Sequence, residues 1–244
     1  NLEFWLDYGS ALGAFRHKGF IPWDDDIDIG MMREDYNRVI PLLKDDLESI
    51  GFYINCGENG YNNPIIRILH KNYSFGQIDI FPYDIYPQKI NNNGERLNIL
   101  KDNQKAHLKF IKIWNKNKNI HINNLINSIR NNNEAINSQK ENFSIITGCE
   151  FPPDVIENYE DVFPLRKIQF EDLELLTYKN IENYLEHIYG NWMSFPDKLF
   201  IHGIDFYIKN QLNNTDNSIE FLNYIKQKVS GIIEKNKLNP LKEL

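Results

Sequence analysis

The sequence predicts an α+β protein in which helices flank a mixed β-sheet. Strand-like segments, in which apolar residues alternate with polar ones or run together, recur in the first third of the chain, at residues 4–8, 26–30, 65–69 and 77–81. Helix-like segments, with apolar residues three and four positions apart, begin near residues 33 and 178. A chain of 244 residues with 41% hydrophobic residues can bury one full core, so we expect a single domain over residues 1–244.

The first predicted strand, Phe4–Tyr8, leads directly into a short predicted helix. Gly9 allows a tight exit from the strand, and Ser10 is a suitable N-cap for a helix that ends near Gly19. The N-terminus of a helix presents free N–H groups and a positive dipole to an anion. We therefore expect Gly9 and Ser10 to bind a phosphate group of a substrate.

An acidic run follows this helix and contains Asp24, Asp25, Asp26 and Asp28, with isoleucines alternating with the last two. Side chains two positions apart in a strand share a face, so Asp26 and Asp28 should point the same way. Two carboxylates held this close repel each other unless a cation lies between them, and oxygen ligands suit Mg²⁺ or Mn²⁺. The alternative is an acidic turn that only contacts solvent.

The next predicted elements are a helix, a strand and a hairpin. Arg33–Tyr36 opens a helix that Pro41 could kink or break, and Gly51–Ile54 begins a strand. The segments Ile65–Leu69 and Gln77–Phe81 are typical of two strands joined by a short polar loop.

A third carboxylate, Asp79, lies between two isoleucines in the second strand of this hairpin. We expect that strand to lie beside the acidic strand, with Asp79 roughly 4–6 Å from Asp26 and Asp28, because paired metal ions lie close together. The alternative is an aspartate at a strand edge that faces water. Arg67, on the first strand of the hairpin, must find a partner there, either a carboxylate of the site or a phosphate of the substrate.

The remainder of the chain is less informative. Residues 91–145 are rich in Asn and Lys, and we expect a polar insertion made of helices and loops. We expect Trp23 to pack beneath the acidic run. Further along, short strands are predicted at 162–165 and 168–171, and helices at 178–189, ending at Gly190, and at 218–235.

Composition limits the function class. The net charge of −7 argues against binding to a nucleic-acid polymer, which usually requires a basic surface. The two cysteines, Cys56 and Cys149, lack the spacing of a zinc site or a disulfide framework, which fits a reducing compartment.

No apolar run approaches the roughly 20 residues of a membrane span, and no signal peptide precedes the first strand. Because the chain starts almost inside that strand, we expect the natural polypeptide to begin before Asn1. We expect a cytoplasmic location, including peripheral association with the inner membrane face; the alternative is a missing N-terminal targeting segment.

A Gly-Ser pair that is followed by Asp-x-Asp on the next strand resembles the signature of the polymerase-β-like nucleotidyltransferase fold. Residues 5–36 are similar in detail to the opening of the LicD family, which includes bacterial phosphocholine transferases and the animal fukutin and fukutin-related proteins. Two later pieces also fit the family: Ile78–Asp84, and Val162–Leu165 together with Tyr184-Leu185 and Tyr189-Gly190.

This resemblance implies an Mg²⁺-dependent transferase that moves a phospho-alcohol such as phosphocholine from a CDP-linked donor to a sugar hydroxyl of a surface glycan, for example lipopolysaccharide, teichoic acid or capsule. It implies that Asp26 and Asp28 hold the metal ion. Asp79 would be a third ligand or the general base that activates the hydroxyl.

The resemblance also implies a set of groups that bind the donor. The amides of Gly9 and Ser10 would orient its diphosphate, and Asp24 matches the first acid of the family motif. Arg16 and Lys18 either reach the diphosphate or only complement the end of their helix. Two other functions remain open: attack on the α-phosphorus of a nucleoside triphosphate with release of pyrophosphate, or a binding module without catalysis.

Overall fold

The computed structural model of the chain describes residues 1–22, 24–56, 64–72, 76–116, 142–152 and 154–194. Trp23, the predicted helix at 218–235 and much of the predicted insertion lie outside the described residues. The prediction of a single domain over 1–244 therefore stays a prediction.

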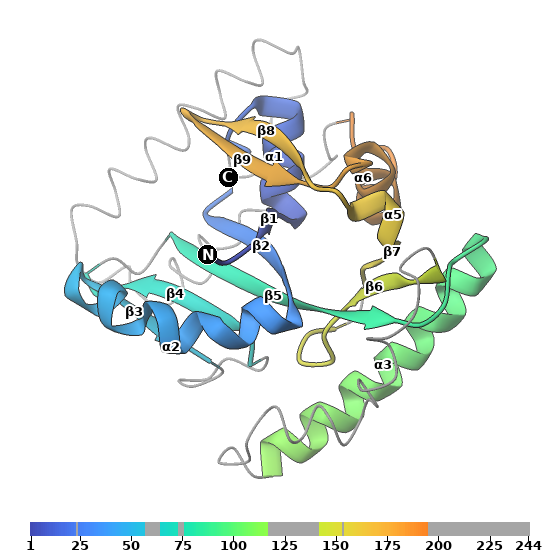
Figure 1. Ribbon diagram of the computed structural model, residues 1–244, viewed down its shortest axis with the longest axis horizontal. Helices are drawn as coiled ribbons and strands as arrows, with labels where there is room; N and C mark the ends of the chain where they lie inside the picture. Colours follow the sequence, from blue (N-terminus) through green and yellow to red (C-terminus); the bar gives the residue numbers. More distant parts are fainter. Residues whose placement is uncertain (23, 57–63, 73–75, 117–141, 153, 195–244) are drawn as a thin grey trace, which may run out of the picture.

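A mixed seven-stranded sheet forms the centre of the fold (Figure 1). Five strands follow the order β1-β2-β5-β4-β3, and β6 and β7 extend the sheet from the second half of β5. The bounds are β1 Trp5–Leu6, β2 Asp26–Met32, β3 Phe52–Asn55, β4 Ile66–His70, β5 Gln77–Tyr86, β6 Ser144–Thr147 and β7 Ile156–Asn158. The α+β prediction with a mixed sheet is confirmed.

The pairing of β2 with β5 determines where the acidic residues lie. These strands run parallel, and Asp28 is the register partner of Asp79. β4 runs antiparallel to β5 on its other side and places Arg67 opposite Asp79. The predicted hairpin and the predicted neighbourhood of the two acidic strands are both confirmed.

β5 is longer than predicted because Pro82 does not end it. β4 pairs with β5 only as far as Ile80, and β6 begins to pair at Tyr83. Pro82 lies at the break between these two partners, where its missing N–H removes no bond of either ladder.

Helices cover the sheet, and a separate β-hairpin packs on the first helix (Figure 1). The helices are α1 Tyr8–His17, α2 Arg33–Ser49, α3 Asn93–Lys116, α5 Tyr159–Val162 and α6 Ile181–Tyr189. The hairpin consists of β8 Arg166–Phe170 and β9 Leu173–Thr177. Helix α2 lies against β2 and β5, whereas α1 contacts β2, β8 and α6. Of the helices that the structure describes, none combines the length and the apolar character needed to cross a bilayer.

One hydrophobic core joins the N-terminal and C-terminal parts of the described chain. Trp5 and Leu6 of β1 are fully buried in it together with Tyr184 and Leu185 of α6. The ring of Trp5 lies against Tyr83 of β5, with 5.1 Å between the centroids. The sheet and α6 are therefore parts of the same packed unit.

Arg33, the first residue of α2, directly follows β2 and binds two buried carboxylates, at the end of β2 remote from the acidic run. Its guanidinium donates two hydrogen bonds to the buried Asp84 of β5 and two to the buried Glu150, at distances between 2.5 and 3.0 Å. Gly148 allows this packing, because a Cβ there would lie 2.5 Å from both the Arg33 and the Glu150 side chains. Replacing Arg33 by an uncharged residue would leave two buried carboxylates without a positive charge beside them.

One local prediction about the first helix was wrong. Helix α1 begins at Tyr8 and is capped by Asp7, whose carboxylate accepts from the Tyr8 N–H, so Ser10 is not the N-cap. Asp and Ser are equally good caps, and the sequence places both here. At the other end the helix stops near Gly19 as predicted, and its C-cap Lys18 adopts the left-handed conformation, with φ of 60°. Helix α2 continues through Pro41 without a break.

The predictions for the second half of the chain need four corrections. The predicted insertion at 91–145 is too long, because the sheet resumes with β6 at Ser144. Its described first part is one helix, α3, rather than several. Residues 162–165 form no strand; they span the end of α5 and the turn before β8. Helix α6 ends at Gly190 as predicted but begins at Ile181 instead of Tyr178.

Candidate active site

Three carboxylates converge where β2 and β5 lie side by side. Asp26, Asp28 and Asp79 each offer an oxygen atom, and these three atoms lie within 4.8 Å of one another. Strand alternation puts Asp26 and Asp28 on one face, and the register sets Asp79 opposite Asp28. The predicted proximity of Asp79 to the pair is confirmed, while the catalytic and metal-binding roles of the three stay predictions.

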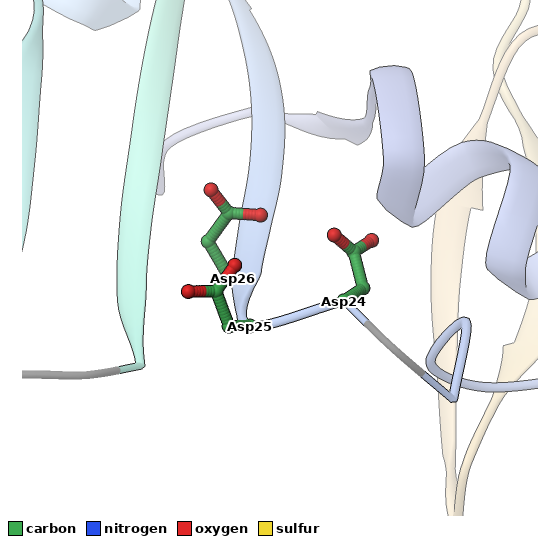
Figure 2. A group of neighbouring side chains, drawn as sticks. All are labelled: Asp24, Asp25 and Asp26. Carbon is green, nitrogen blue, oxygen red and sulfur yellow. The ribbon is translucent and has the colours of Figure 1, made fainter. Parts of the chain in front are cut away.

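A second acidic group adjoins the first and shares Asp26 with it. Asp24, Asp25 and Asp26 also offer oxygen atoms within 4.8 Å of one another. Figure 2 shows Asp25 and Asp26 together at the start of β2, with Asp24 on the loop toward α1. Asp26 therefore lies between two sets of carboxylate oxygens.

The electrostatics of the cluster suit a bound cation. Burial raises the pKa of Asp79 to about 7; Arg67 opposes this rise and Asp26 adds to it. Burial, with the charges of Asp26 and Asp25, also raises the pKa of Asp24 to about 7. The pKa of Asp28 is raised well above its ordinary value by burial and by Asp26. Without a cation, the cluster therefore takes up protons near neutral pH.

The oxygen atoms of the cluster fit a hard divalent cation. Asp79 Oδ1 is buried and has no hydrogen-bond partner among the described residues, although 93% of this residue's surface is covered. A buried, unpartnered carboxylate oxygen is costly unless a further group binds it. The donor atoms of both acidic groups are carboxylate oxygens, which favour Mg²⁺ or Mn²⁺ over zinc.

Arg67 pairs with a carboxylate of the site, which is one of the two partners expected from the sequence; the other was a phosphate of the substrate. Its Nε lies 3.3 Å from Oδ2 of Asp79, and both side chains are largely buried. This ion pair restrains one oxygen of Asp79, while the buried Oδ1 has no hydrogen-bond partner among the described residues. A contact of Arg67 with substrate stays a prediction.

Gly9 and Ser10 hold Asp28 in place. The Gly9 N–H donates to Asp28 Oδ2 at 3.2 Å, and the Asp28 N–H donates to Ser10 Oγ at 2.9 Å. A Cβ on Gly9 would lie 2.6 Å from Asp24 Oδ2, so glycine leaves the space that the Asp24 carboxylate uses. Their predicted contact with a substrate phosphate is untested, but both residues belong to the site.

Arg16 and Lys18 are not brought to the acidic cluster by the contacts seen here. They lie at the C-terminal end of α1, about 10 Å along the helix axis from Gly9. The Arg16 guanidinium donates to the Trp192 carbonyl at 3.0 Å, and Lys18 is exposed. Their proposed role in binding the donor remains a prediction that these contacts do not support.

Asp7 was not predicted as a site residue, yet it adjoins the acidic cluster: its N–H donates to the Asp28 carbonyl at 3.0 Å. Asp7 is fully buried and accepts hydrogen bonds from the hydroxyls of Tyr83, Tyr178 and Tyr184 at 2.7, 2.8 and 2.5 Å. Burial raises the pKa of Asp7, and the three hydroxyls oppose that rise. An acidic residue within an apolar strand was the available signal, but its tyrosine partners lie far away in the sequence.

Tyr8 is the second residue that was missed. It has a φ of 34°, in the left-handed region that a tyrosine adopts only at a cost. Its N–H donates to Asp7 Oδ1 and to the Tyr184 hydroxyl, at 3.0 and 2.9 Å, and its own hydroxyl donates to Asp154 at 2.6 Å. The pKa of Asp154 is raised to about 6 by burial, and the bond from Tyr8 opposes this rise.

Comparison with known proteins agrees with this geometry. Residues 1–112 match the family model described as LicD/FKTN/FKRP, nucleotidyltransferase domain. An uncharacterized protein of Rickettsia typhi is 36% identical over 97 residues, which are 37% of this chain and 29% of that protein. Lipopolysaccharide cholinephosphotransferase LicD of Haemophilus influenzae is 51% identical over 41 residues, 17% of this chain and 16% of the relative. Human ribitol 5-phosphate transferase FKRP is 31% identical over 91 residues, 36% of this chain and 17% of the relative.

Each matched stretch thus spans less than a third of the relative's own length. Asp24, Asp26, Asp28 and Asp79 all lie inside the region that the family model matches, and so do Gly9 and Ser10. The resemblance read from the sequence motifs is confirmed over residues 1–112, which match the LicD/FKTN/FKRP nucleotidyltransferase domain model.

Proposed function

We propose that this chain is a metal-dependent phosphotransferase that moves a phospho-alcohol from a CDP-linked donor to a hydroxyl group of a surface glycan. The observation that carries the proposal is the triangle of Asp26, Asp28 and Asp79, whose oxygens lie within 4.8 Å of one another inside the matched domain. Two relatives are named for transferring phosphocholine and ribitol 5-phosphate, and choline and ribitol are both alcohols.

In this proposal Asp26, Asp28 and Asp79 hold Mg²⁺ or Mn²⁺. A bound divalent cation would neutralise charge on the donor diphosphate and on the leaving nucleotide. Between the two roles considered for Asp79, the structure favours that of ligand. Arg67 occupies one of its oxygens, and the other is buried rather than exposed to an incoming hydroxyl.

The other residues of the site would keep the ligands in position. Gly9 and Ser10 restrain Asp28 through its carboxylate and its N–H, and Arg67 restrains Asp79. Asp24 lies over the first turn of α1, where it can orient water or donor groups next to the triangle. A geometry fixed before the substrates bind lowers the reorganisation that phosphoryl transfer requires.

The acceptor and the location belong to the same proposal. A sugar hydroxyl on lipopolysaccharide, teichoic acid or capsule would attack the phosphorus distal to cytidine, and CMP would leave. A nucleotide-linked donor fits the cytoplasmic location expected from the sequence, including association with the inner membrane face.

A donor screen tests the function. CDP-choline, CDP-ethanolamine, CDP-glycerol and CDP-ribitol are each incubated with Mg²⁺ and a glycan acceptor, and release of CMP is followed. CTP is included, because release of pyrophosphate from CTP would identify the chain as a nucleotidyltransferase instead. The matched control is Asp28→Asn, which keeps the shape of the side chain but removes its charge. No CMP or pyrophosphate from any donor, with the parent and the control behaving alike, would support a binding module.

A further inference from the structure

We propose that Tyr184 of α6 is a positioning residue for the metal ligand Asp28. The inference rests on the proposed function, since it assigns Asp28 to the metal. It adds that the site depends on a hydroxyl group outside residues 1–112, the part that the family model matches.

The Tyr184 hydroxyl holds the start of α1 through two hydrogen bonds. It donates to Asp7 Oδ1 at 2.5 Å and accepts from the Tyr8 N–H at 2.9 Å. Tyr184 is only 1% exposed, so water does not replace these bonds in the folded protein. Tyr8 has the strained φ of 34°, and such a conformation persists only where neighbouring groups hold it.

The residues that Tyr184 holds are those that contact Asp28. The Asp7 N–H donates to the Asp28 carbonyl at 3.0 Å, and the Gly9 N–H donates to the Asp28 carboxylate at 3.2 Å. Asp7, Tyr8 and Gly9 are consecutive in the chain, so a change of φ at Tyr8 moves the Gly9 N–H relative to Asp7. A hydroxyl of α6 thus sets the orientation of a carboxylate on β2 through a single turn of backbone.

Tyr178 provides a matched control. Its ring stacks on that of Tyr184, with 3.9 Å between centroids and 11° between planes, and it is also fully buried. Its hydroxyl donates to the same oxygen, Asp7 Oδ1, at 2.8 Å. Of these two tyrosine hydroxyls, however, only that of Tyr184 also accepts the Tyr8 N–H, which it shares with Asp7 Oδ1. Tyr→Phe at either position removes a bond to Asp7, but only the change at 184 also removes one of the two acceptors of the Tyr8 N–H.

The experiment measures Mn²⁺ binding by electron paramagnetic resonance, which needs no substrate and no turnover. The parent, Tyr184→Phe, Tyr178→Phe and Asp28→Asn are compared, and thermal unfolding is recorded for each without metal. We expect Tyr184→Phe to weaken Mn²⁺ binding about tenfold, the lower end of the effect of losing a group that orients a metal ligand. Tyr178→Phe should keep the affinity within about twofold, although both tyrosine variants melt at similar, lower temperatures than the parent.

A second measurement is independent of metal binding. Amide hydrogen exchange of Gly9 in the metal-free protein should be faster in Tyr184→Phe than in Tyr178→Phe, because only the former removes a hydrogen bond of the first turn of α1. Equal Mn²⁺ affinities or equal Gly9 exchange rates in the two tyrosine variants would overturn the positioning role. If Asp28→Asn alone lost Mn²⁺, the metal site would stand and the role of Tyr184 would fall. A parent that binds no Mn²⁺ would overturn both.

Discussion

The free energy of unfolding of the metal-free protein should fall as the pH rises from 5 to 8, because Asp79 ionises in this range. A carboxyl group whose pKa is higher in the folded state than in the unfolded state destabilises the fold once it ionises. The destabilisation caused by Asp79 is absent below its ordinary pKa of 3.8. It grows as the pH rises and levels off above the pKa of about 7 that Asp79 has in the folded state. Between pH 5 and pH 8 this amounts to roughly 2–3 kcal/mol of lost unfolding free energy for Asp79 alone.

The assay is urea unfolding at pH 5 and pH 8 in EDTA, with Asp79→Asn as the control. Asparagine keeps a carbonyl oxygen for Arg67 but cannot ionise, so the variant should lose roughly 2–3 kcal/mol less stability than the parent over this range. Mg²⁺ should restore the parent at pH 8 more than at pH 5, because it binds only the folded, ionised cluster. If parent and variant differ in pH dependence by less than about 1 kcal/mol, or if the parent becomes more stable at pH 8, the reasoning is wrong.

Four further outcomes follow from the structure. Asp26→Ala and Asp28→Ala should each abolish transfer. In EDTA neither variant should melt at a lower temperature than the parent, because each change relieves repulsion between carboxylates. Activity within about tenfold of the parent (roughly 1.4 kcal/mol of barrier) would refute the metal assignment. Activity should require Mg²⁺ or Mn²⁺ and be lost in EDTA, and stoichiometric zinc in the purified protein, measured by elemental analysis, would contradict the oxygen-only site. Gly9→Ala should displace the Asp24 side chain and reduce donor turnover with little change in melting temperature. A Gly9→Ala variant that fails to fold would show that the surrounding structure has no room to adjust. Arg33→Met should lower the free energy of unfolding in urea by about 3–5 kcal/mol, because the two carboxylate partners of Arg33 stay buried. A loss below about 1 kcal/mol would mean that water hydrates these carboxylates instead.

The parts of the site that depend on strand periodicity could be predicted from the sequence. The isoleucines that alternate with Asp26, Asp28 and Asp79 identify both strands and the shared face, since a shift by one residue would bury the acids. The β2–β5 pairing then brings the three together. Arg67 was constrained in the same way, because a cation on an apolar strand must find an anion.

The contacts that depend on distant parts of the chain could not be predicted. Nothing near Asp7 in the sequence indicates that Tyr178 and Tyr184 are its partners, because the tyrosines face a core assembled by the whole fold. Propensity could not decide between Asp7 and Ser10 as the helix cap. The continuation of β5 through Pro82 depends on where β4 ends and β6 begins, which is a property of the sheet and not of the segment.

The tyrosines around Asp7 also have a consequence for how the protein folds. Tyr178 and Tyr184 are separated from Asp7 by 171 and 177 residues along the chain, and they close over a carboxylate on the first strand. Contacts of such long range form late, because the entropy of closing the intervening chain must be lost first. The acidic residues can therefore approach one another early through β2 and β5, yet the first turn of α1 is fixed only when α6 docks. During synthesis, the acidic residues could therefore come together before the first turn of α1 is fixed, which requires that α6, the last described helix, has left the ribosome.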